Sequence, residues 1–312
     1  MNTALSNRRV VDKVLTNVVL GYDLDQEFSG HHLFPDVTVN EFGGKIVMFG
    51  KEAYVILNTK RAPGETVRGV GISYSAQDYV LNNRLLEALS PEEFIEIGQK
   101  ANIAVKAQAV NKVFRLMRLE GEYDKATLAL DPNHYGSTNK TTLSGNSQWS
   151  DPTADVLTQV SDARETVRSK TGRYPNVFHL DAKGFAALRK NNAIKEQFKY
   201  SGKPSITTDM LASYFDVDKV VVGRAVSTGV NGDFVDIWAG SSVLAYVPPK
   251  AMQSQAVMSY GYNYVHKGYP LVEKEYYDKS DRSWHNPVLF RDKAVLTDPD
   301  AGFLFIATTG EV

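Results

Sequence analysis

The stretch that decides the fold runs from Ser90 to Gly121 and reads SPEEFIEIGQKANIAVKAQAVNKVFRLMRLEG. It opens with a serine suited to an N-cap, a proline suited to the first helical position, and then glutamates, which is typical of a helix start. Apolar residues recur on one face of a 3.6-residue period; these are Ile95, Ile103, Val110, Val113, Phe114 and Met117. The pattern predicts one amphipathic helix of about thirty residues, roughly 45 Å long, ending at Gly121.

The opposite face of this predicted helix is basic. Its cationic residues are Lys100, Lys112, Arg115 and Arg118. No acidic residue lies between Gly98 and Leu119, so the second half of the helix carries a net positive charge. For a lone helix, an ordinary solvated face is the simplest interpretation of such an arc.

Composition narrows the class of protein. The chain has 312 residues, 43% of them hydrophobic, which is enough for a substantial core in one or two domains. It has 35 Lys and Arg against 36 Asp and Glu, so any electrostatic function must come from local charge segregation. The absence of cysteine excludes disulfides and thiolate chemistry. Because neither a signal peptide nor an apolar run of membrane length is visible, we expect a soluble protein of a reducing compartment.

Strand-like patterns flank a turn between Lys45 and Ala76. One arm of this predicted hairpin covers residues 46–57 and the other covers residues 67–75, with Arg61-Ala62-Pro63-Gly64 at the tip. The hairpin has little apolar surface, and an isolated two-stranded ribbon is at best marginally stable in water. It therefore needs a partner surface, which either another subunit or its own domain could supply.

The region after the long helix predicts short elements separated by a polar loop. Ala126 to Leu130 reads as a short strand, and residues 134–150, rich in Gly, Ser, Thr and Asn, read as an exposed mobile loop. Trp149-Ser150-Asp151-Pro152 then predicts the start of a helix that stops at Gly172.

Strand patterns dominate the C-terminal part. Asn231-Gly232 predicts a hairpin turn, and Tyr260, Tyr262 and Tyr264 alternate on one face of a predicted strand. The order of elements is a hairpin, a long helix, a compact mixed region and then antiparallel strands. This order indicates an α+β fold.

The sequence contains no recognisable catalytic signature, because Walker, dinucleotide-binding and nucleophile-elbow patterns are all absent. His31 and His32 are adjacent on an extended chain, so they point to opposite sides and chelate a metal poorly. His179 lies in an apolar strand and is interpreted as a core histidine. We therefore predict a non-enzyme with no catalytic, cofactor-binding or metal-ligating residue, although a scattered active site stays a rival hypothesis.

Several short motifs, taken in their order along the chain, resemble those of one protein family. They are Leu33-Phe34-Pro35-Asp36-Val37, Arg61-Ala62-Pro63-Gly64, Tyr79, Pro91-Glu92-Glu93, Trp149-Ser150-Asp151-Pro152, Thr171-Gly172-Arg173-Tyr174-Pro175-Asn176 and the stretch from Ile194 to Leu211. This order is similar to that of the major capsid proteins of tailed bacteriophages with the Hong Kong ninety-seven-type shell fold. The resemblance covers nearly the whole chain.

The resemblance implies a phage capsid shell fold with four parts. They are an N-terminal arm (1–44), an extended loop (45–80), a peripheral domain (81–150 and 249–312) with a spine helix (90–121), and an axial domain (151–248). It further implies a virion protein, assembled in the host cytoplasm, whose hexamers and pentamers form an icosahedral shell around double-stranded DNA. The implied partners are further copies of the chain, a portal protein, a separate scaffolding protein and a decoration protein, with no membrane and no cofactor.

The resemblance also implies contact residues. Those of the extended loop that would touch a neighbouring subunit are Lys51, Lys60, Arg61, Pro63, Gly64, Glu65 and Arg68. Lys51 and Lys60 also lie where some relatives form a lysine–asparagine crosslink, but no partner asparagine is identifiable. The basic arc of Lys112, Arg115 and Arg118 could face packaged DNA instead of solvent. The alternative within the fold is the shell protein of a bacterial nanocompartment, an encapsulin, which encloses a cargo enzyme.

Overall fold

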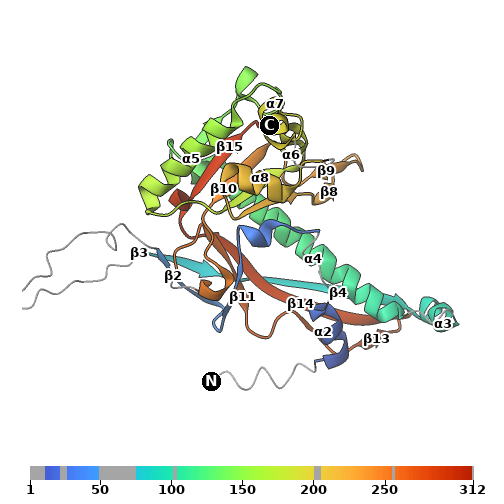
Figure 1. The fold of residues 1–312 in the computed structure, drawn as a ribbon. Helices are drawn as coiled ribbons and strands as arrows, with labels where there is room; N and C mark the ends of the chain where they lie inside the picture. Colours follow the sequence, from blue (N-terminus) through green and yellow to red (C-terminus); the bar gives the residue numbers. More distant parts are fainter. Residues whose placement is uncertain are drawn as a thin grey trace, which may run out of the picture.

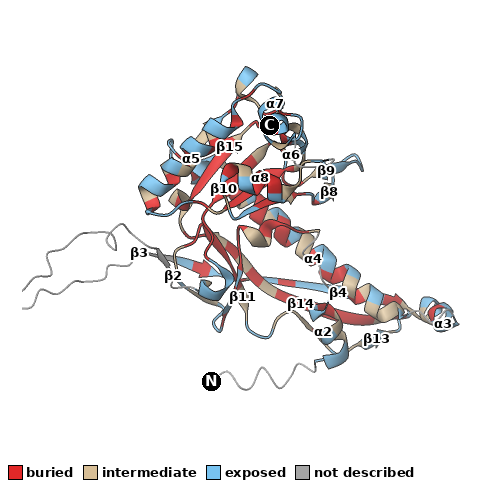
Figure 2. Ribbon diagram, in the orientation of Figure 1, coloured by how far each residue is buried: buried red, intermediate tan, exposed pale blue. Residues whose placement is uncertain are grey.

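The computed structural model describes residues 11–21, 27–48, 75–100, 104–199, 205–254 and 257–310. These residues form two lobes, each built on its own β-sheet (Figure 1). Buried residues follow the two sheets and the sides of the helices that cover them (Figure 2). Helices and strands are mixed without regular alternation, so the α+β class predicted from the sequence is confirmed.

The first lobe is organised around one long strand, β14 (Ser283–Leu296). Five further strands complete its sheet: β4 (Asn82–Pro91), β11 (Gly261–His266), β12 (Leu271–Val272) and β13 (Tyr276–Asp278) pair with β14 antiparallel, and β1 (Asp36–Val39) pairs with β11 in parallel. Helix α4 (Val105–Leu130) packs on β4 and β14, and α2 (Lys13–Leu20) packs on α4 and β12. Tyr260, Tyr262 and Tyr264 are buried at β11, as their alternation predicted.

Two helices take the place of the single long helix predicted from Ser90 to Gly121. The first, α3, runs from Glu92 to Lys100, and the second, α4, begins at Val105. Ser90 does not cap a helix, because it lies in β4 opposite Trp284 of β14. Pairing with a central strand thus outweighs the local capping signal.

The end of the long helix also differs from the prediction. Gly121 is buried within α4, where an added Cβ would lie 3.5 Å from a carboxylate oxygen of Asp292. The helix continues to Leu130 and stops before Asp131-Pro132, since proline cannot continue the hydrogen-bond pattern. Residues 126–130 are therefore the last turns of α4, and the prediction of a strand there is wrong.

The second lobe holds a five-stranded sheet covered by four helices. Its strand order is β5 (Lys140–Thr142), β15 (Gly302–Ile306), β10 (Ser241–Ala245), β6 (Val177–Asp181) and β7 (Lys219–Gly223). The helices are α5 (Val156–Thr171), α6 (Ala182–Leu188), α7 (Asn192–Phe198) and α8 (Thr208–Phe215). A small hairpin of β8 (Val226–Thr228) and β9 (Phe234–Asp236) turns at Gly232, whose positive φ fits the predicted Asn-Gly turn.

Helix α5 confirms one predicted boundary and corrects the other. It ends at Gly172, which adopts the left-handed conformation with φ of 70°. It begins at Val156 with Asp155 as N-cap, so Trp149-Ser150-Asp151-Pro152 does not start a helix. Trp149 is instead fully buried and packs edge-on against Phe178 of β6.

The polar segment 134–150 is ordered, contrary to the prediction of a mobile loop. It contains β5, which pairs in parallel with β15, and the short 3-10 turn Gly145–Ser147. The side chain of Asn139 is buried and donates hydrogen bonds to the backbone carbonyls of Asp300 and Gly302. Polar residues here satisfy backbone groups, which composition alone cannot distinguish from solvent exposure.

The C-terminal strands divide between the lobes, which corrects the predicted grouping of 249–312 with residues 81–150. Strand β14 belongs to the first sheet, but β15 lies inside the second sheet between β5 and β10. Strand β5, within 81–150, also belongs to the second sheet. The chain therefore crosses between the lobes more often than the sequence indicated.

The predicted hairpin has a described base. Strands β2 (Gly43–Met48) and β3 (Ser75–Val80) pair antiparallel. Tyr79 of β3 is buried and its ring stacks on Tyr264 of β11, with centroids 4.8 Å apart. The base of the hairpin is thus fixed to the first lobe by aromatic packing.

Candidate assembly site

The predicted contact residues of the extended loop cannot be placed. Lys51, Lys60, Arg61, Pro63, Gly64, Glu65 and Arg68 all lie outside the described residues. Their role stays a prediction from the sequence.

The basic arc of α4 lies partly against the N-terminal arm. Arg115 forms an ion pair with Glu27, and its Nε lies 2.9 Å from Glu27 Oε2. Arg118 is mostly buried, with a guanidinium nitrogen 3.9 Å from Asp36 Oδ2. Lys112 is exposed. Two of the three predicted cations therefore help to seat the arm on the helix.

A cavity of about 560 Å³ lies where the arm, α4 and the second lobe meet. Arg118, Lys219 and Asp36 are among its lining residues, together with the histidine pair His31 and His32. The two imidazole rings contact each other with centroids 3.9 Å apart, and Lys219 Nζ lies 3.2 Å from His32 Nε2. The pKa of His32 is lowered to about 3, chiefly because the ring is buried and further because His31 and the positively charged Lys219 lie next to it.

One buried carboxylate joins the two lobes and the arm. Glu122 of α4 accepts hydrogen bonds from the backbone N–H groups of Ser29 and Gly30, at 2.9 and 2.8 Å. It also accepts one from the indole Nε1 of Trp238, at 2.7 Å, and the Ser29 hydroxyl lies 2.8 Å from Nε2 of His179 on β6. We call Ser29, Gly30, Glu122, His179 and Trp238 the junction.

The junction requires a very close approach of the backbone. A Cβ added to Gly30 would lie 2.7 Å from Glu122 Oε2. A Cβ added to Gly223 of β7 would lie 2.6 Å from the Trp238 side chain. Both positions therefore need glycine, and the residues around Glu122 hold the arm, the helix and the second sheet in one arrangement.

His179 is the core histidine that the sequence predicted, and it is fully buried. Its ring packs against that of Trp238 in a tilted arrangement, with centroids 4.0 Å apart. Burial, together with His32 and His31, lowers the pKa of His179 to about 3. The folded protein therefore holds this imidazole neutral at pH values where the unfolded chain would protonate it.

This neutral imidazole predicts acid-sensitive stability. Since the folded pKa is below the unfolded value of 6.5, His179 contributes its stability above pH 6.5 and loses it as the pH falls toward 3. Its contribution to the free energy of unfolding is expected to fall by about 2 kcal/mol between pH 6.5 and 5. Urea unfolding at several pH values measures how steeply the free energy of unfolding depends on pH. In the variant His179→Asn, unfolding at acid pH should take up one proton fewer, so this dependence should be shallower. An unchanged slope in the variant would contradict the assignment.

A charge cluster centred on a buried arginine holds α4 against the sheet of the first lobe. The Arg84 side chain on β4 is only 7% exposed and contacts three carboxylates. Its nitrogens lie 2.6 Å from Glu120, 2.5 Å from Asp124 and 2.8 Å from Asp292. Since Glu120 and Asp124 are on α4 and Asp292 is on β14, this cluster fixes the helix over the strands.

Exposed apolar side chains occur on β4 and on α3, the helix that follows it directly. Phe94 and Ile97 of α3 are 60% and 61% exposed, and Leu85 and Leu89 of β4 are 57% and 52% exposed. In α3 only Gly98 is buried, so this helix has almost no core of its own. We call Phe94, Ile97, Leu85 and Leu89 the apolar end. Large contiguous apolar patches on a protein surface often mark protein–protein contacts.

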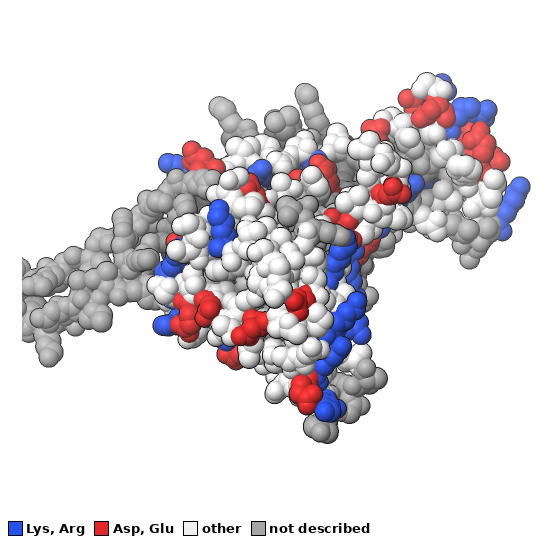
Figure 3. Space-filling view, turned by 90° about the horizontal axis from the view of Figure 1, so that it is seen from above, with Lys and Arg blue, Asp and Glu red and all other residues white. Residues whose placement is uncertain are grey.

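Charge is unevenly distributed on the surface seen from above the second lobe. Lysines and arginines gather in a row along one side of this face, and acidic side chains are spread over the rest (Figure 3). Among the described helices, none combines the length and the apolar composition that a membrane span requires.

The sequence did not point to the junction or to the Arg84 cluster. Ser29 and Glu122 are 93 residues apart, and Glu122 and Trp238 are 116 apart. No local spacing connects such residues. Of the junction residues, only His179 was predicted, as a core histidine, and Gly121 next to Glu122 was predicted to end the helix.

Comparison with known proteins identifies the class to which this fold and these surfaces belong. Residues 123–286 match the family described as "Phage major capsid protein E". The chain is 34% identical over 310 residues to the major capsid protein of Burkholderia phage BcepMu, covering 98% of this chain and 99% of that protein. It therefore belongs to the phage major capsid protein family, which makes it a structural protein of the virion capsid and confirms the resemblance.

Solved structures agree with this assignment. A crystal structure of a phage-related protein from Bordetella bronchiseptica is 34% identical, with a TM-score of 0.83, and the match covers 97% of this chain and 99% of that one. An encapsulin complex from Synechococcus elongatus shares the fold at 11% identity and a TM-score of 0.55, covering 100% of this chain and 98% of that one. The encapsulin likeness extends to the fold alone.

Proposed function

We propose that this chain self-assembles as hexamers and pentamers into an icosahedral capsid that encloses the double-stranded DNA of a tailed bacteriophage. The observation that carries the proposal is the relation to a phage major capsid protein over 98% of the chain. In this proposal the first lobe is the peripheral domain, the second lobe is the axial domain, and assembly takes place in the host cytoplasm. A structural subunit needs no catalytic centre.

The extended loop is the proposed intersubunit element. Its base, β2 and β3, is fixed to the first lobe through Tyr79, while Arg61-Ala62-Pro63-Gly64 forms the predicted tip. Contact with a neighbouring subunit would supply the surface that the ribbon lacks, because buried interface area replaces a core. The exposed apolar end of the first lobe supports the same proposal of close packing between copies. A portal protein, a scaffolding protein and a decoration protein are further proposed partners.

The basic arc is proposed to meet the packaged DNA mainly through Lys112. Arg115 and Arg118 lie next to the carboxylates of Glu27 and Asp36, which partly neutralise their positive charge and so weaken their attraction for phosphate. Contacts of lysine with phosphate are independent of base sequence and weaken with salt.

The alternative function within this fold is an encapsulin-type shell that holds a cargo protein. The fold likeness to the encapsulin complex supports it at 11% identity, whereas a phage capsid protein is 34% identical. The contents of purified particles distinguish the two: packaged double-stranded DNA favours the capsid, and a co-purifying cargo enzyme favours the nanocompartment.

Electron microscopy of the purified chain tests the proposal, and deletion of residues 58–65 is its mutational arm. We expect closed shells from the natural chain. The deleted chain should remain folded, since its β2–β3 base stays attached through Tyr79, but it should form no stable shells. Circular dichroism checks the fold and sedimentation checks the assembly. A lone soluble monomer from the natural chain would refute the capsid proposal, and normal shells from the deleted chain would refute the role of the loop.

A further inference from the structure

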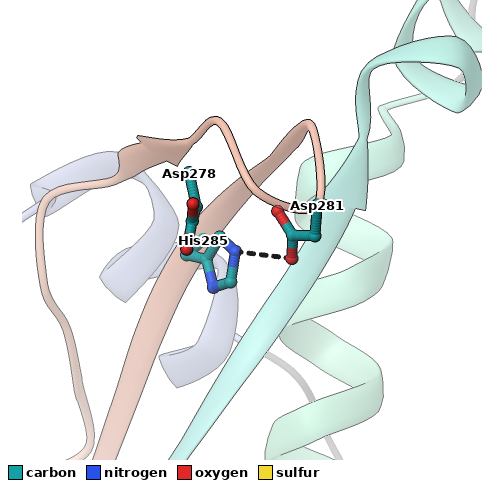
Figure 4. A group of neighbouring side chains, drawn as sticks. All are labelled: Asp278, Asp281 and His285. Carbon is teal, nitrogen blue, oxygen red and sulfur yellow. Dashed lines mark hydrogen bonds and ion pairs between the residues drawn. The ribbon is translucent and has the colours of Figure 1, made fainter.

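Three potential metal ligands converge at the turn between β13 and β14. Asp278 is the last residue of β13, Asp281 lies in the turn and His285 is on β14. One donor atom from each lies within 4.8 Å of the others, and this is the one such group among the described residues. In the view of Figure 4, the two aspartates lie on either side of the imidazole ring of His285.

The distances fit a shared ion without a large rearrangement. His285 Nε2 and Asp281 Oδ2 are 3.0 Å apart. Two ligands at about 2.1 Å from one zinc ion are separated by roughly 3 to 3.5 Å. His285 is only 7% exposed, so its ring is held in place by packing. Asp278 keeps its carboxylate next to the ring because its Oδ1 accepts hydrogen bonds from the backbone and hydroxyl of Ser280.

An independent group outside these three ligands orients the histidine. Glu87, on the neighbouring strand β4, lies with Oε2 2.9 Å from His285 Nδ1. The hydroxyl of Tyr276 donates to both Glu87 oxygens, at 3.0 and 3.1 Å, and its ring stacks on the imidazole with centroids 4.9 Å apart. With Nδ1 held by Glu87, Nε2 is the nitrogen that faces Asp281. This carboxylate–histidine arrangement is the one that supports metal-binding histidines in proteins.

We propose that Asp278, Asp281 and His285 form a binding site for one divalent transition metal of the zinc class, with Glu87 as the positioning carboxylate. One imidazole nitrogen and two carboxylate oxygens suit Zn²⁺ and its neighbours, whereas Ca²⁺ takes six to eight oxygen ligands. The metal takes the place of a proton on Nε2.

Such an ion would tie together three strands at one end of the first lobe. It would bind the β13–β14 turn directly and would be linked to β4 through the hydrogen bond between His285 and Glu87. Leu89, two residues after Glu87 on β4, pairs with His285 across the sheet. Leu89 belongs to the apolar end, so metal binding would stiffen the surface beside it. The proposal stands independently of capsid assembly, because all of its groups belong to one chain.

Titration of the purified full-length chain with ZnCl₂ after treatment with a chelator tests the site. Calorimetry should detect one saturable ion per chain, and the unfolding temperature should rise with Zn²⁺. The double variant Asp278→Asn, Asp281→Asn should lose at least tenfold in affinity, while Glu87→Gln should lose about 10- to 100-fold through the misplaced ring. Both variants leave the hydrophobic core intact, and circular dichroism verifies their folding.

The matched control is Asp131→Asn. Asp131 and His134 form a surface pair 4.0 Å apart, and the described residues supply no third ligand to it, so this variant should bind Zn²⁺ like the natural chain. Three results would overturn the proposal: no saturable binding, equal loss in the control, or undiminished binding by the double variant. Binding of CaCl₂ as tight as that of ZnCl₂ would overturn the assignment to a transition metal.

Discussion

Replacing Glu122 with alanine is expected to lower the free energy of unfolding by about 3 to 5 kcal/mol. The variant removes one carboxylate that accepts from Ser29, Gly30 and Trp238, and none of these donors has room to reach water in the buried junction. Chemical denaturation measures the loss. Hydrogen exchange at the amides of Ser29 and Gly30 should accelerate at the same time, because the arm loses its attachment to α4.

Glu120→Ala is the matched control for this prediction. Glu120 lies two residues earlier on α4, its side chain is 63% exposed, and Arg84 keeps Asp124 and Asp292 when it is removed. Its cost should stay within about 1 kcal/mol. Glu122→Gln should fall between the two, because the amide keeps one acceptor oxygen. If Glu122→Ala were as mild as Glu120→Ala, the junction would not hold the lobes together.

Replacing both Phe94 and Ile97 with serine is expected to block assembly while leaving the subunit folded. The two side chains are 60% and 61% exposed, so the isolated chain loses little packing. Serine has about the same helix propensity as the residues it replaces. If both side chains are buried between copies, each is worth about 2 kcal/mol, and the loss raises the concentration needed for assembly by about three orders of magnitude.

Light scattering against protein concentration measures this assembly threshold. The control variant Glu93→Gln, Glu96→Gln changes two exposed residues of the same helix without removing apolar area. We expect its threshold to stay within about tenfold of that of the natural chain, since exposed charges contribute little. Unchanged assembly by the serine variant would show that the apolar end is not a contact between copies.

Local patterns in the sequence predicted those elements whose signals agree with their tertiary surroundings. The alternating tyrosines of β11, the Gly172 helix end and the Asn-Gly turn before β9 are all of this kind. The helix start was misplaced by only two residues, because Pro91 and Glu92 are compatible with either the end of a strand or the start of a helix. What decides between them is the pairing of Ser90 with Trp284, nearly two hundred residues later.

The incorrect predictions share one physical cause: the conformation of each residue is decided by a partner that is distant in the sequence. Gly121 was predicted to end a helix, but in the structure it lies inside α4 next to Asp292. Asn139 was predicted to lie in a loop, but its side chain donates a hydrogen bond to the backbone of Gly302 in β15. The candidate site was harder still, because the junction joins residues of the arm, α4, β6 and the segment after β9. Of the function, only the capsid family could be inferred from the sequence, through the order of its motifs.

The division of the last two strands between the lobes has a consequence for synthesis on the ribosome. The central strand of the first sheet is complete only when residue 296 has been made, and an inner strand of the second sheet only when residue 306 has been made. Neither lobe can therefore close before translation is almost finished. A chain cut short before residue 302 lacks an inner strand of the second sheet, which leaves the backbone groups of the neighbouring strands β5 and β10 unpaired.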